Sequence, residues 1–378
     1  MKLTVKGPEL RDAAAWAAKI APSNPPQPVM AGVKLTAGDD LTLSATDYET
    51  FGTARCTSTT QDAGSVVVSG RLLAAVAKIA GNTPDVTLVS DGAELEIRAG
   101  RASWKLPTME ADLWPQFPTP GEPLGRIDGA HLEDTLSRVA VAADDGTLNQ
   151  DILRGVYLEL GEALTLTATN TFRMARLTVE WTAMTSEPAA IIVPATVLKH
   201  LGTDGEVTIS TDGSVIGLTT RQRTVIGRLI AGKYKDCEPI FQAVVDNAIG
   251  TVTVDVQELR AAIESAAILT GEADHLALDF SDQAVEVSKV SSRSDKGDGD
   301  ASASVDMQGS TGEILSIDVK ANYIKDALFG LHSPSALFTF ARVPRMRTSP
   351  IMLQPCDDGG NVADDYRHVL VPIKRAGQ

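Results

Sequence analysis

Aromatic residues and cysteines are scarce in this 378-residue chain. Phe, Trp and Tyr together make up 4% of it, and Cys56, Cys237 and Cys356 lie far apart without CxxC spacing. This cysteine pattern indicates neither a disulfide framework nor a zinc site, so we expect three free thiols. The 43% of hydrophobic and 22% of charged residues exclude a disordered chain, and the length predicts about two to three domains.

Long apolar runs are also missing. In residues 1–21 the apolar positions are interrupted by Lys6, Glu9, Arg11, Asp12 and Lys19, which excludes a signal-peptide core or a transmembrane span there. We therefore expect a cytoplasmic protein with no membrane partner.

Motifs for catalysis and nucleotide binding are absent as well. The sequence has no GxxxxGK[ST], no GxGxxG that opens a helix and no GxSxG, and its five histidines lack HExxH spacing. Most carboxylates lie in turns or at the starts of predicted helices, where capping and solubility explain them. The sequence thus predicts a non-catalytic binding protein with no cofactor. An enzyme with an unrecognised site is the alternative.

One acidic stretch with glycines, residues 291–306, invites a calcium-binding interpretation. It lacks the order of acidic positions, glycine and closing Glu that an EF-hand needs. We interpret it as a solvated hairpin loop and predict no metal site.

Internal repeats are what the sequence does contain. Residues 32–35 match 155–158 and residues 41–46 match 164–169, both at an offset of 123, while residues 85–92 match 206–213 at an offset of 121. The last pair ends in Asp-Gly, which predicts hairpin turns. Such periods exceed the usual solenoid repeat, so each copy is expected to be a domain with its own core.

A third, fainter copy completes the pattern. In each copy a short alternating strand leads into a helix, marked at the same place by Leu10, Leu132 and Leu259. Later in each copy a strand feeds a second helix, in the stretches that begin at residues 66, 191 and 317. We predict an α+β fold of three repeated domains, each with two helices on antiparallel sheets. The predicted boundaries are 1–120, 121–247 and 248–378.

The net charge of −15 counts against nucleic acid for the chain as a whole, but not for every surface of it. In the predicted helix 70–80, Arg71 and Lys78 lie opposite a predicted core face of Leu72, Leu73, Val76 and Ile79. Solvated polar faces explain such cations most simply. The alternative is that equivalent helices line one basic surface that contacts phosphates. The candidate positions are Arg11, Lys19, Arg71, Lys78, Arg138, Lys199 and Lys325.

These repeats and several local phrases resemble the bacterial β sliding clamp family, the processivity subunit of DNA polymerase III. The likeness covers the whole chain and depends on the order and spacing of the phrases, since none of them is a strong motif alone. The phrases are PVMAGVKL, LTLSATDYE and VVVSGRLL in the first copy, SWKLPTMEADLWPQFP at its end, LRGVYLE and LTLTATNTFRMA in the second copy, ESAAIL in the third, and YRHVLVPIK near residue 370.

The resemblance implies a head-to-tail homodimer that closes a six-domain ring around double-stranded DNA, with helices inside and sheets outside. A mildly basic channel within an acidic molecule would make few, sequence-independent phosphate contacts. The implied partners are DNA, the polymerase III catalytic subunit, the clamp loader and repair polymerases, bound through short linear motifs, and the implied location is the cytoplasm, at the nucleoid during replication. A clamp-shaped scaffold that does not encircle DNA is the alternative.

Ring closure needs a heterologous contact between the first domain of one subunit and the third domain of the other. The family's interface positions correspond to Trp104 and Leu106 on one side and to Ile268 and Leu269 on the other. Ordinary core packing is the alternative for all four.

The resemblance also implies an apolar pocket between the second and third domains that receives partner peptides. The corresponding residues are Leu153, Gly155, Thr169, Thr171, Phe172, Arg173, Met174, Lys235, Ile240, Val369, Leu370, Val371, Pro372 and Ile373, with Tyr323 and Pro350 at the edge.

The chain departs from the usual family pattern at several of these positions. The turn before Arg173 commonly reads Asp-Gly-His or Asp-Gly-Tyr and here reads Asn170-Thr171-Phe172, and Lys235 replaces a loop proline. In the first domain, Asn24 replaces a DNA-facing arginine. We interpret the chain as a divergent clamp: a second copy, a phage-encoded clamp, or a variant that evades a pocket-binding peptide inhibitor, with a role in antibiotic resistance.

Overall fold

A computed structural model describes residues 1–201, 205–268, 275–281, 283–290, 301–346, 348–357, 361–362 and 365–373. The chain divides into two compact units. The first comprises Met1–Glu133, Trp181–Ser186 and Val193–Leu229, and the second comprises Asp134–Glu180, Glu187–Ile192 and Ile230–Gln378. The division runs through the middle third of the chain.

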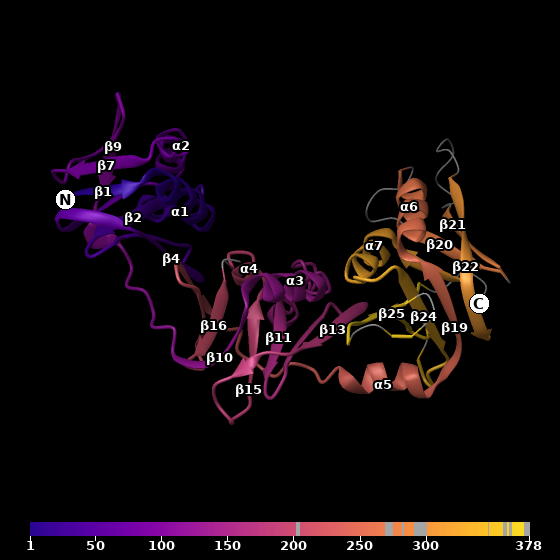
Figure 1. The fold of residues 1–378 in the computed structure, drawn as a ribbon. Coiled ribbons are helices and arrows are strands. Elements are labelled where there is room, and N and C mark those ends of the chain that lie inside the picture. The colour runs from indigo at the N-terminus through magenta and orange to yellow at the C-terminus, as the bar shows by residue number, and fades with distance from the viewer. Residues whose placement is uncertain are drawn as a thin grey trace. The chain divides into compact units, whose positions relative to one another are not determined.

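The first unit is built on one continuous antiparallel sheet. Within the described residues its strands follow the order β14 (Thr182–Ala183), β10 (Glu122–Asp128), β16 (Glu206–Thr211), β17 (Val215–Thr219), β18 (Arg223–Arg228), β4 (Thr50–Cys56), β3 (Leu41–Thr46), β2 (Gly32–Ala37), β6 (Gly64–Ser69), β9 (Ala102–Met109), β8 (Glu94–Ala99), β7 (Asp85–Ser90), β1 (Lys2–Lys6) and β5 (Ser58–Asp62). Its helices are α1 (Gly7–Ile20), α2 (Gly70–Ala80) and α4 (Ala195–Leu198). Figure 1 shows α1 and α2 side by side on the sheet.

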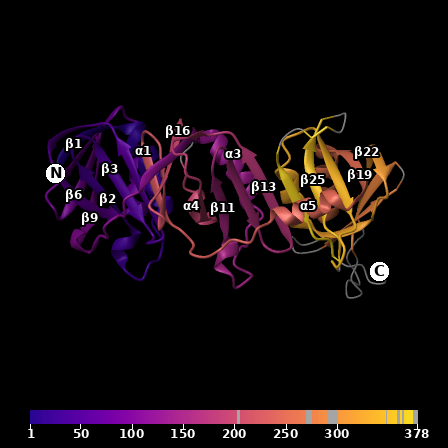
Figure 2. The same cartoon turned by 90° about the horizontal axis from the view of Figure 1, so that it is seen from below.

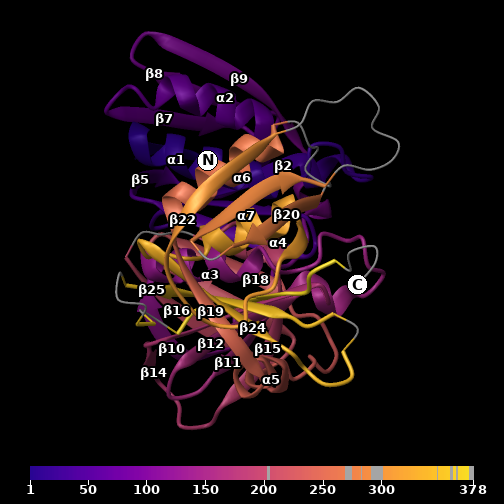
Figure 3. The ribbon, with the colours of Figure 1, turned by 90° about the vertical axis from the view of Figure 1, so that its right-hand side faces the viewer.

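The second unit has its own continuous antiparallel sheet. Its described strands follow the order β15 (Ala189–Pro194), β11 (Gly155–Leu160), β12 (Leu164–Thr169), β13 (Arg173–Val179), β26 (Arg367–Leu370), β25 (Ile351–Cys356), β24 (Ser335–Ala341), β19 (Ala248–Asp255), β22 (Ser302–Gly312), β21 (Ala284–Lys289), β20 (His275–Phe280) and β23 (Ile317–Lys320). Its helices are α3 (Gly129–Ala140, from Asp134 on), α5 (Glu238–Asp246), α6 (Val256–Ala267) and α7 (Ala321–Phe329). Helix α5 lies against β25 (Figure 2), and α6 packs across β20, β21 and β22 (Figure 3).

Local sequence explains these elements. Strand β2 alternates buried Val33, Leu35 and Ala37 with half-buried neighbours, as a strand with one core face must. The predicted helix 70–80 is confirmed as α2, and Ser69 caps it by accepting a hydrogen bond from the Leu72 amide.

The predicted core face of α2 is partly wrong. Leu73, Ala77 and Ala80 are buried, whereas Leu72 is 37% and Ile79 58% exposed. The helix packs through its small residues, which leaves these two large apolar side chains at the surface.

The repeat is visible in how the domains join. In the first unit β4 pairs with β18, with Thr50 opposite Gly227. In the second unit β13 pairs with β26, with Arg173 opposite Leu370. Thr50 and Arg173 are equivalent residues at the repeat offset of 123. The same strand-to-strand junction, in the same register, therefore occurs once in each unit.

Candidate functional site

A cavity of about 620 Å³ opens in the second unit where three segments meet. The 3-10 helix Asp151–Arg154 forms one side, the ends of β12 and β13 form a second, and the chain leading into α5 forms the third. The lining residues are Gln150, Asp151, Ile152, Leu153, Thr169, Thr171, Met174, Ala231, Lys233, Lys235, Cys237 and Ile240.

The floor of this pocket belongs to the hydrophobic core. Met174 and Cys237 pack in one buried cluster with Tyr234, Phe241 and Val369. Tyr234 also stacks on Tyr157, with ring centroids 5.0 Å apart. Burial raises the pKa of the Cys237 thiol, and the nearby Lys235 acts in the opposite direction. The floor is therefore apolar and held by large neighbours.

A glycine allows the two walls to approach. Gly232 has φ +142°, and a Cβ there would lie 2.5 Å from Cδ1 of Ile152. Any other residue would have to adopt this positive φ and push the end of the Ile152 side chain aside, so glycine suits the close approach of the two walls.

The rim carries cations. Lys233 and Lys235 are exposed, and neither forms an ion pair with any residue that the structure describes. Asp151 also lines the pocket, but its carboxylate lies 3.4 Å from Arg154. The site thus combines an apolar floor with two free positive charges, which suits an apolar ligand that carries an acidic group.

The turn that ends β12 is strained and over-determined. Thr171 has φ +73°, an unusual conformation for a β-branched residue. The Thr171 amide donates to Oγ1 of Thr169, and the amides of Phe172 and Arg173 both donate to Oδ1 of Asn170, each at 3.1 Å. Many hydrogen bonds therefore fix Thr171 at the pocket wall.

The first domain contains the same turn. Tyr48 has φ +74°, its amide donates to Thr46, and Asp47 accepts from Glu49 and Thr50. The turn belongs to the repeated fold, and only its second copy lines the pocket.

Six of the residues expected at the pocket lie together in its lining: Leu153, Thr169, Thr171, Met174, Lys235 and Ile240. The expected residues outside the lining are Gly155, Phe172, Arg173, Tyr323, Pro350, Val369, Leu370, Val371, Pro372 and Ile373. Of these, Val369 lies opposite Met174, and the Val371 amide donates to the Phe172 carbonyl. Ile373 donates its amide to the Asp318 carbonyl at 2.7 Å.

Arg173 faces the junction of β13 and β26 and not the pocket. Its guanidinium lies 4.3 Å from the ring centroid of Tyr323 and 2.5 Å from Oδ2 of Asp326. The Asn170 amide donates to the Tyr323 hydroxyl beside it. Arg173 and Tyr323 thus fasten the pocket-forming turn to α7.

Sequence reasoning missed Gln150, Asp151, Ile152, Ala231, Lys233 and Cys237 as lining residues. They lie in loops and a single 3-10 turn, which have no periodicity to read. Gly232, between Ala231 and Lys233, is the one local signal for this segment of the wall.

Outside this pocket, two strands inside the described sheets have a stretch with one unpaired edge, in addition to the terminal strands β5, β14, β15 and β23. In the first unit, residues 102–107 of β9 pair with β8 alone, and only Thr108 and Met109 reach β6. In the second unit, residues 302–306 of β22 pair with β21 alone among the described residues, and the rest of β22 pairs with β19. Trp104 is half-exposed on the first of these edges, whereas Leu106 is only 6% exposed.

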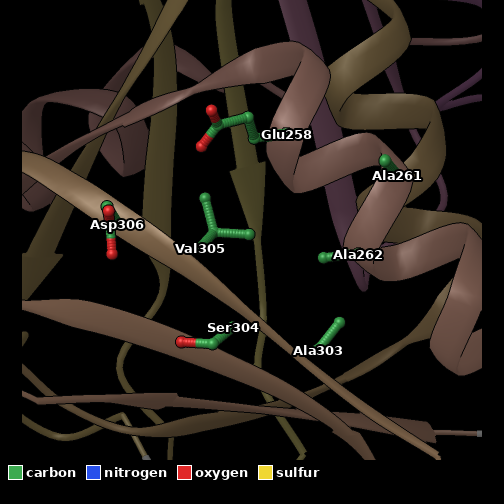
Figure 4. Close-up of a pocket in the computed structure, with 7 residues that line it drawn as sticks. All are labelled: Glu258, Ala261, Ala262, Ala303, Ser304, Val305 and Asp306. Carbon is green, nitrogen blue, oxygen red and sulfur yellow. The ribbon is translucent and has the colours of Figure 1, made fainter.

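Beside the second edge lies a groove of about 500 Å³ between α6 and β22. Figure 4 shows its small side chains, among them Ala261, Ala262 and Ala303, with the carboxylates of Glu258 and Asp306 towards one end. The Glu258 amide donates to the capping residue Asp255, which fixes the start of α6. Ile268, just past α6, is 79% exposed, and Leu269 lies outside the described residues.

The candidate DNA-facing residues differ in exposure. Lys19, Asn24, Arg71, Lys78 and Lys199 are exposed and Lys325 is half-exposed, while half-exposed Arg11 pairs with Asp12 at 3.0 Å. The expectation for Arg138 is wrong. Its side chain is buried, donates from Nε to the Gly330 carbonyl at 2.8 Å and stacks on Tyr366, so residues next to α7 and β26 cover it.

No three His, Cys, Asp or Glu side chains gather as a metal site would require in the described part of the chain, and residues 291–300 of the acidic loop lie outside it. No helix among the described residues is long and apolar enough to cross a membrane.

Comparison with known proteins places this geometry in a family. Family models of the DNA polymerase III beta subunit match the chain at residues 1–118 (N-terminal domain), 126–236 (central domain) and 246–373 (C-terminal domain). The matched family comprises non-catalytic processivity subunits of DNA polymerase III.

Similar proteins cover most or all of the chain. A beta sliding clamp of Streptomyces coelicolor is 29% identical over the whole of both chains, and one of Micrococcus luteus is 32% identical over 66% of this chain and 84% of its own. The beta sliding clamp homolog GriR of Streptomyces muensis is 27% identical over 90% of this chain and 91% of its own.

Solved clamps share the fold. The Pseudomonas aeruginosa sliding clamp bound to griselimycin superposes with a TM-score of 0.86 at 23% identity, over 99% of this chain and all of that one. The Thermotoga maritima beta subunit superposes equally well, at 22% identity and the same coverage. With three clamp domains matched in order along the sequence, this chain belongs to the bacterial beta sliding clamp family.

Proposed function

We propose that the chain forms a head-to-tail homodimeric ring that encircles double-stranded DNA and tethers DNA polymerase III and other factors to it. Its three domains would span residues 1–120, 121–247 and 248–378, and it would act in the cytoplasm at the nucleoid. The observation that carries this proposal is the repeated junction together with the unpaired stretches of β9 and β22.

The open edges are complementary by position. Strand β4 of the first domain pairs with β18 of the second, and β13 of the second pairs with β26 of the third. The equivalent strands left over are β22 of the third domain and β9 of the first. A second copy of the chain satisfies both, and the same antiparallel contact then occurs at every junction of a closed ring.

Burial at the paired junctions supports the same arrangement. Trp104 is equivalent to Val225 by the repeat offset of 121, and His368 takes the corresponding place opposite β13. Val225 is 1% and His368 0% exposed, whereas Trp104 is half-exposed. Trp104 therefore has the exposure expected at a junction that lacks its partner, whereas Leu106 is already buried within its own domain. Both would lie at the contact with the region of Ile268 and Leu269.

Contact with DNA would be weak and independent of sequence. The exposed helix cations are few, Asn24 adds no charge, and acidic Asp12 lies beside Arg11. Encirclement does not need tight phosphate binding, because a closed ring is retained on the duplex topologically.

The pocket of the second unit would receive a short peptide from a polymerase, the clamp loader or a repair factor. Its apolar floor offers sockets for large side chains, and Lys233 and Lys235 would fix an acidic neighbour. We further propose that the chain is a second or phage-encoded clamp, or one that evades a pocket-binding peptide inhibitor. Thr171, Lys235 and Cys237 in the pocket, and the similarity to GriR, support this finer proposal.

Two measurements test the ring. Sedimentation should find a dimer at micromolar concentration, and a strictly monomeric chain would contradict the proposal. After a clamp loader acts, the protein should stay on nicked circular DNA and leave when the circle is linearised. A dimer that is never retained on the circle would favour a protein-interaction scaffold.

A further inference from the structure

The two junctions seen within the chain share a second contact, between helices. In the first unit, Trp16 of α1 donates Nε1–H to the carbonyl of His200, just after α4, at 3.1 Å. In the second unit, Arg138 of α3 donates Nε–H to the carbonyl of Gly330, just after α7, at 2.8 Å. Trp16 and Arg138 are both the tenth residue of their helices.

Each of these residues also stacks on a partner in the junction strand or directly before it. The guanidinium of Arg223 lies 5.4 Å from the ring centroid of Trp16, and that of Arg138 lies 4.8 Å from the ring centroid of Tyr366. Arg223 and Tyr366 occupy equivalent positions. Arg223 lies four residues before Gly227, which is opposite Thr50, and Tyr366 lies four residues before Leu370, which is opposite Arg173. One arginine and one aromatic ring thus fill both junctions, with the two positions exchanged.

At the open edges, both the tenth helix residue and the residue equivalent to Arg223 and Tyr366 have small side chains. The tenth residue of α6 is Ser265, which is exposed, and the residue equivalent to Arg223 at the offset of 121 is Ala102 on β9. If the ring closes as proposed, Ser265 and Ala102 occupy the positions that an arginine and an aromatic residue fill at the other junctions. Because both side chains are small, a space is left between them.

A third position compensates for this loss. Tyr366 excludes any side chain at residue 330, because a Cβ on Gly330 would lie 2.0 Å from the tyrosine hydroxyl. Residue 330 is the tenth position counted from the start of α7, and the tenth residue of α2 is Ile79. In the first domain, Ala102 stands where the third domain has Tyr366. The helix position equivalent to Gly330, residue 79, can therefore carry a large side chain. Ile79 is 58% exposed in the free chain.

We infer that Ile79 of one subunit fills the space above its own Ala102 and packs on Ser265 of the partner subunit, as the apolar contact of the ring junction. This inference rests on the proposed ring. It names a contact that uses α2 and α6 in addition to the strand edges, and it gives a reason for the exposure of Ile79.

Cross-linking tests the contact directly. Ile79→Cys combined with Ser265→Cys should give a covalent dimer on mild oxidation, since a disulfide needs Cα atoms within about 7 Å. The matched control combines Ile79→Cys with Gln257→Cys, which is exposed on α6 but about 12 Å further along the helix. It should give no cross-link. Cys56, Cys237 and Cys356 are buried and should not interfere.

Exchange of side chains gives a second test. Ser265→Arg alone should weaken the dimer, because it forces a charge against Ile79. Adding Ile79→Gly and Ala102→Tyr recreates the set of residues found at Arg138, Gly330 and Tyr366, and should restore dimerisation. Ile79→Ala should raise the dimer dissociation constant about tenfold for each of the two junctions.

The outcomes separate the two proposals. If the unmodified chain is a dimer but the Ile79 and Ser265 pair does not cross-link and the triple variant is no better than Ser265→Arg, the inference is overturned and the ring stands. If the unmodified chain is monomeric, both the ring and this contact are overturned.

Discussion

The hydroxyl of Tyr366 lies 2.8 Å from Nδ1 of His368 in the interior of the second unit, and it also donates to the Arg138 carbonyl at 3.2 Å. His368 is fully buried, and its other ring nitrogen has no hydrogen-bond partner among the described residues. This arrangement suits a neutral imidazole and penalises a charged one. Burial, with a smaller contribution from the positive charge of Arg173, lowers the pKa of His368 to about 3.

This pKa predicts an acid-sensitive junction. An unfolded histidine takes up a proton below about pH 6.5, whereas folded His368 does so only near pH 3. Its contribution to stability is therefore complete above pH 6.5 and is lost as the pH falls from there towards 3, by up to about 1.4 kcal/mol per pH unit. His368→Val, which introduces the residue found at the equivalent position 225, should remove that part of the slope. Denaturant unfolding of both proteins from pH 8 to 5 measures it, and parallel curves would refute it.

The strained turn predicts a stabilising substitution. Thr171→Gly relieves a left-handed conformation that costs an ordinary residue about 1–2 kcal/mol, offset in part by the greater freedom of glycine when unfolded. We expect a net gain of about 0.5–1 kcal/mol in the free energy of unfolding. Tyr48→Gly in the equivalent turn is the matched control. Both variants should gain stability, and only Thr171→Gly should change peptide affinity, because Tyr48 does not line the pocket.

The pocket floor predicts a separation of stability from binding. Met174 and Met352 are buried in the same core cluster, and only Met174 lines the pocket. Each change to Ala should destabilise the protein by about 2–3 kcal/mol. Calorimetry with a tail peptide of the host polymerase III should then show affinity at least about tenfold weaker for Met174→Ala and unchanged for Met352→Ala. Equal affinities would remove Met174 from the binding site.

The free cations of the rim predict a charge preference. Lys235→Glu should weaken the binding of an acidic tail peptide several-fold at low salt. The difference in affinity from the unmodified protein should shrink as the salt concentration rises. Lys199→Glu, which changes the net charge equally at an exposed site outside the pocket, is the control. A peptide in which Asn replaces the acidic residue should bind both lysine variants alike. If it still distinguishes them, the lysine does not act through charge.

Periodicity and repetition predicted the parts of the fold that depend on near neighbours. The helix at residues 70–80 and the Asp-Gly turns after β7 and β16 follow from local chemistry, and Gly92 and Gly213 have the positive φ such turns need. The pairing of β4 with β18 and of β13 with β26 was not predicted, since strands distant in sequence choose partners by shape and register and not by local pattern.

Side-chain roles were harder to predict than elements. Arg138 was expected to face DNA because of its position on a helix. It is instead equivalent to Trp16, and both residues lie at a junction between domains although only one of them is charged. The same limit applied to Leu72 and Ile79, where hydrophobicity alone could not tell a buried helix position from an exposed one. The expected pocket residues came from the resemblance to the clamp family and not from periodicity, and six of them lie in the lining of the cavity.

The strand pairing at the junctions has a consequence for divergence. Thr50 faces Gly227 in one junction and Arg173 faces Leu370 in the other, yet the two registers are the same. Contacts made by backbone amides and carbonyls require extended chain but no particular side chain. Mutations can therefore accumulate along these strands without opening the contact, so that a protein less than one-third identical to its relatives can keep their architecture while its pocket drifts towards a new ligand.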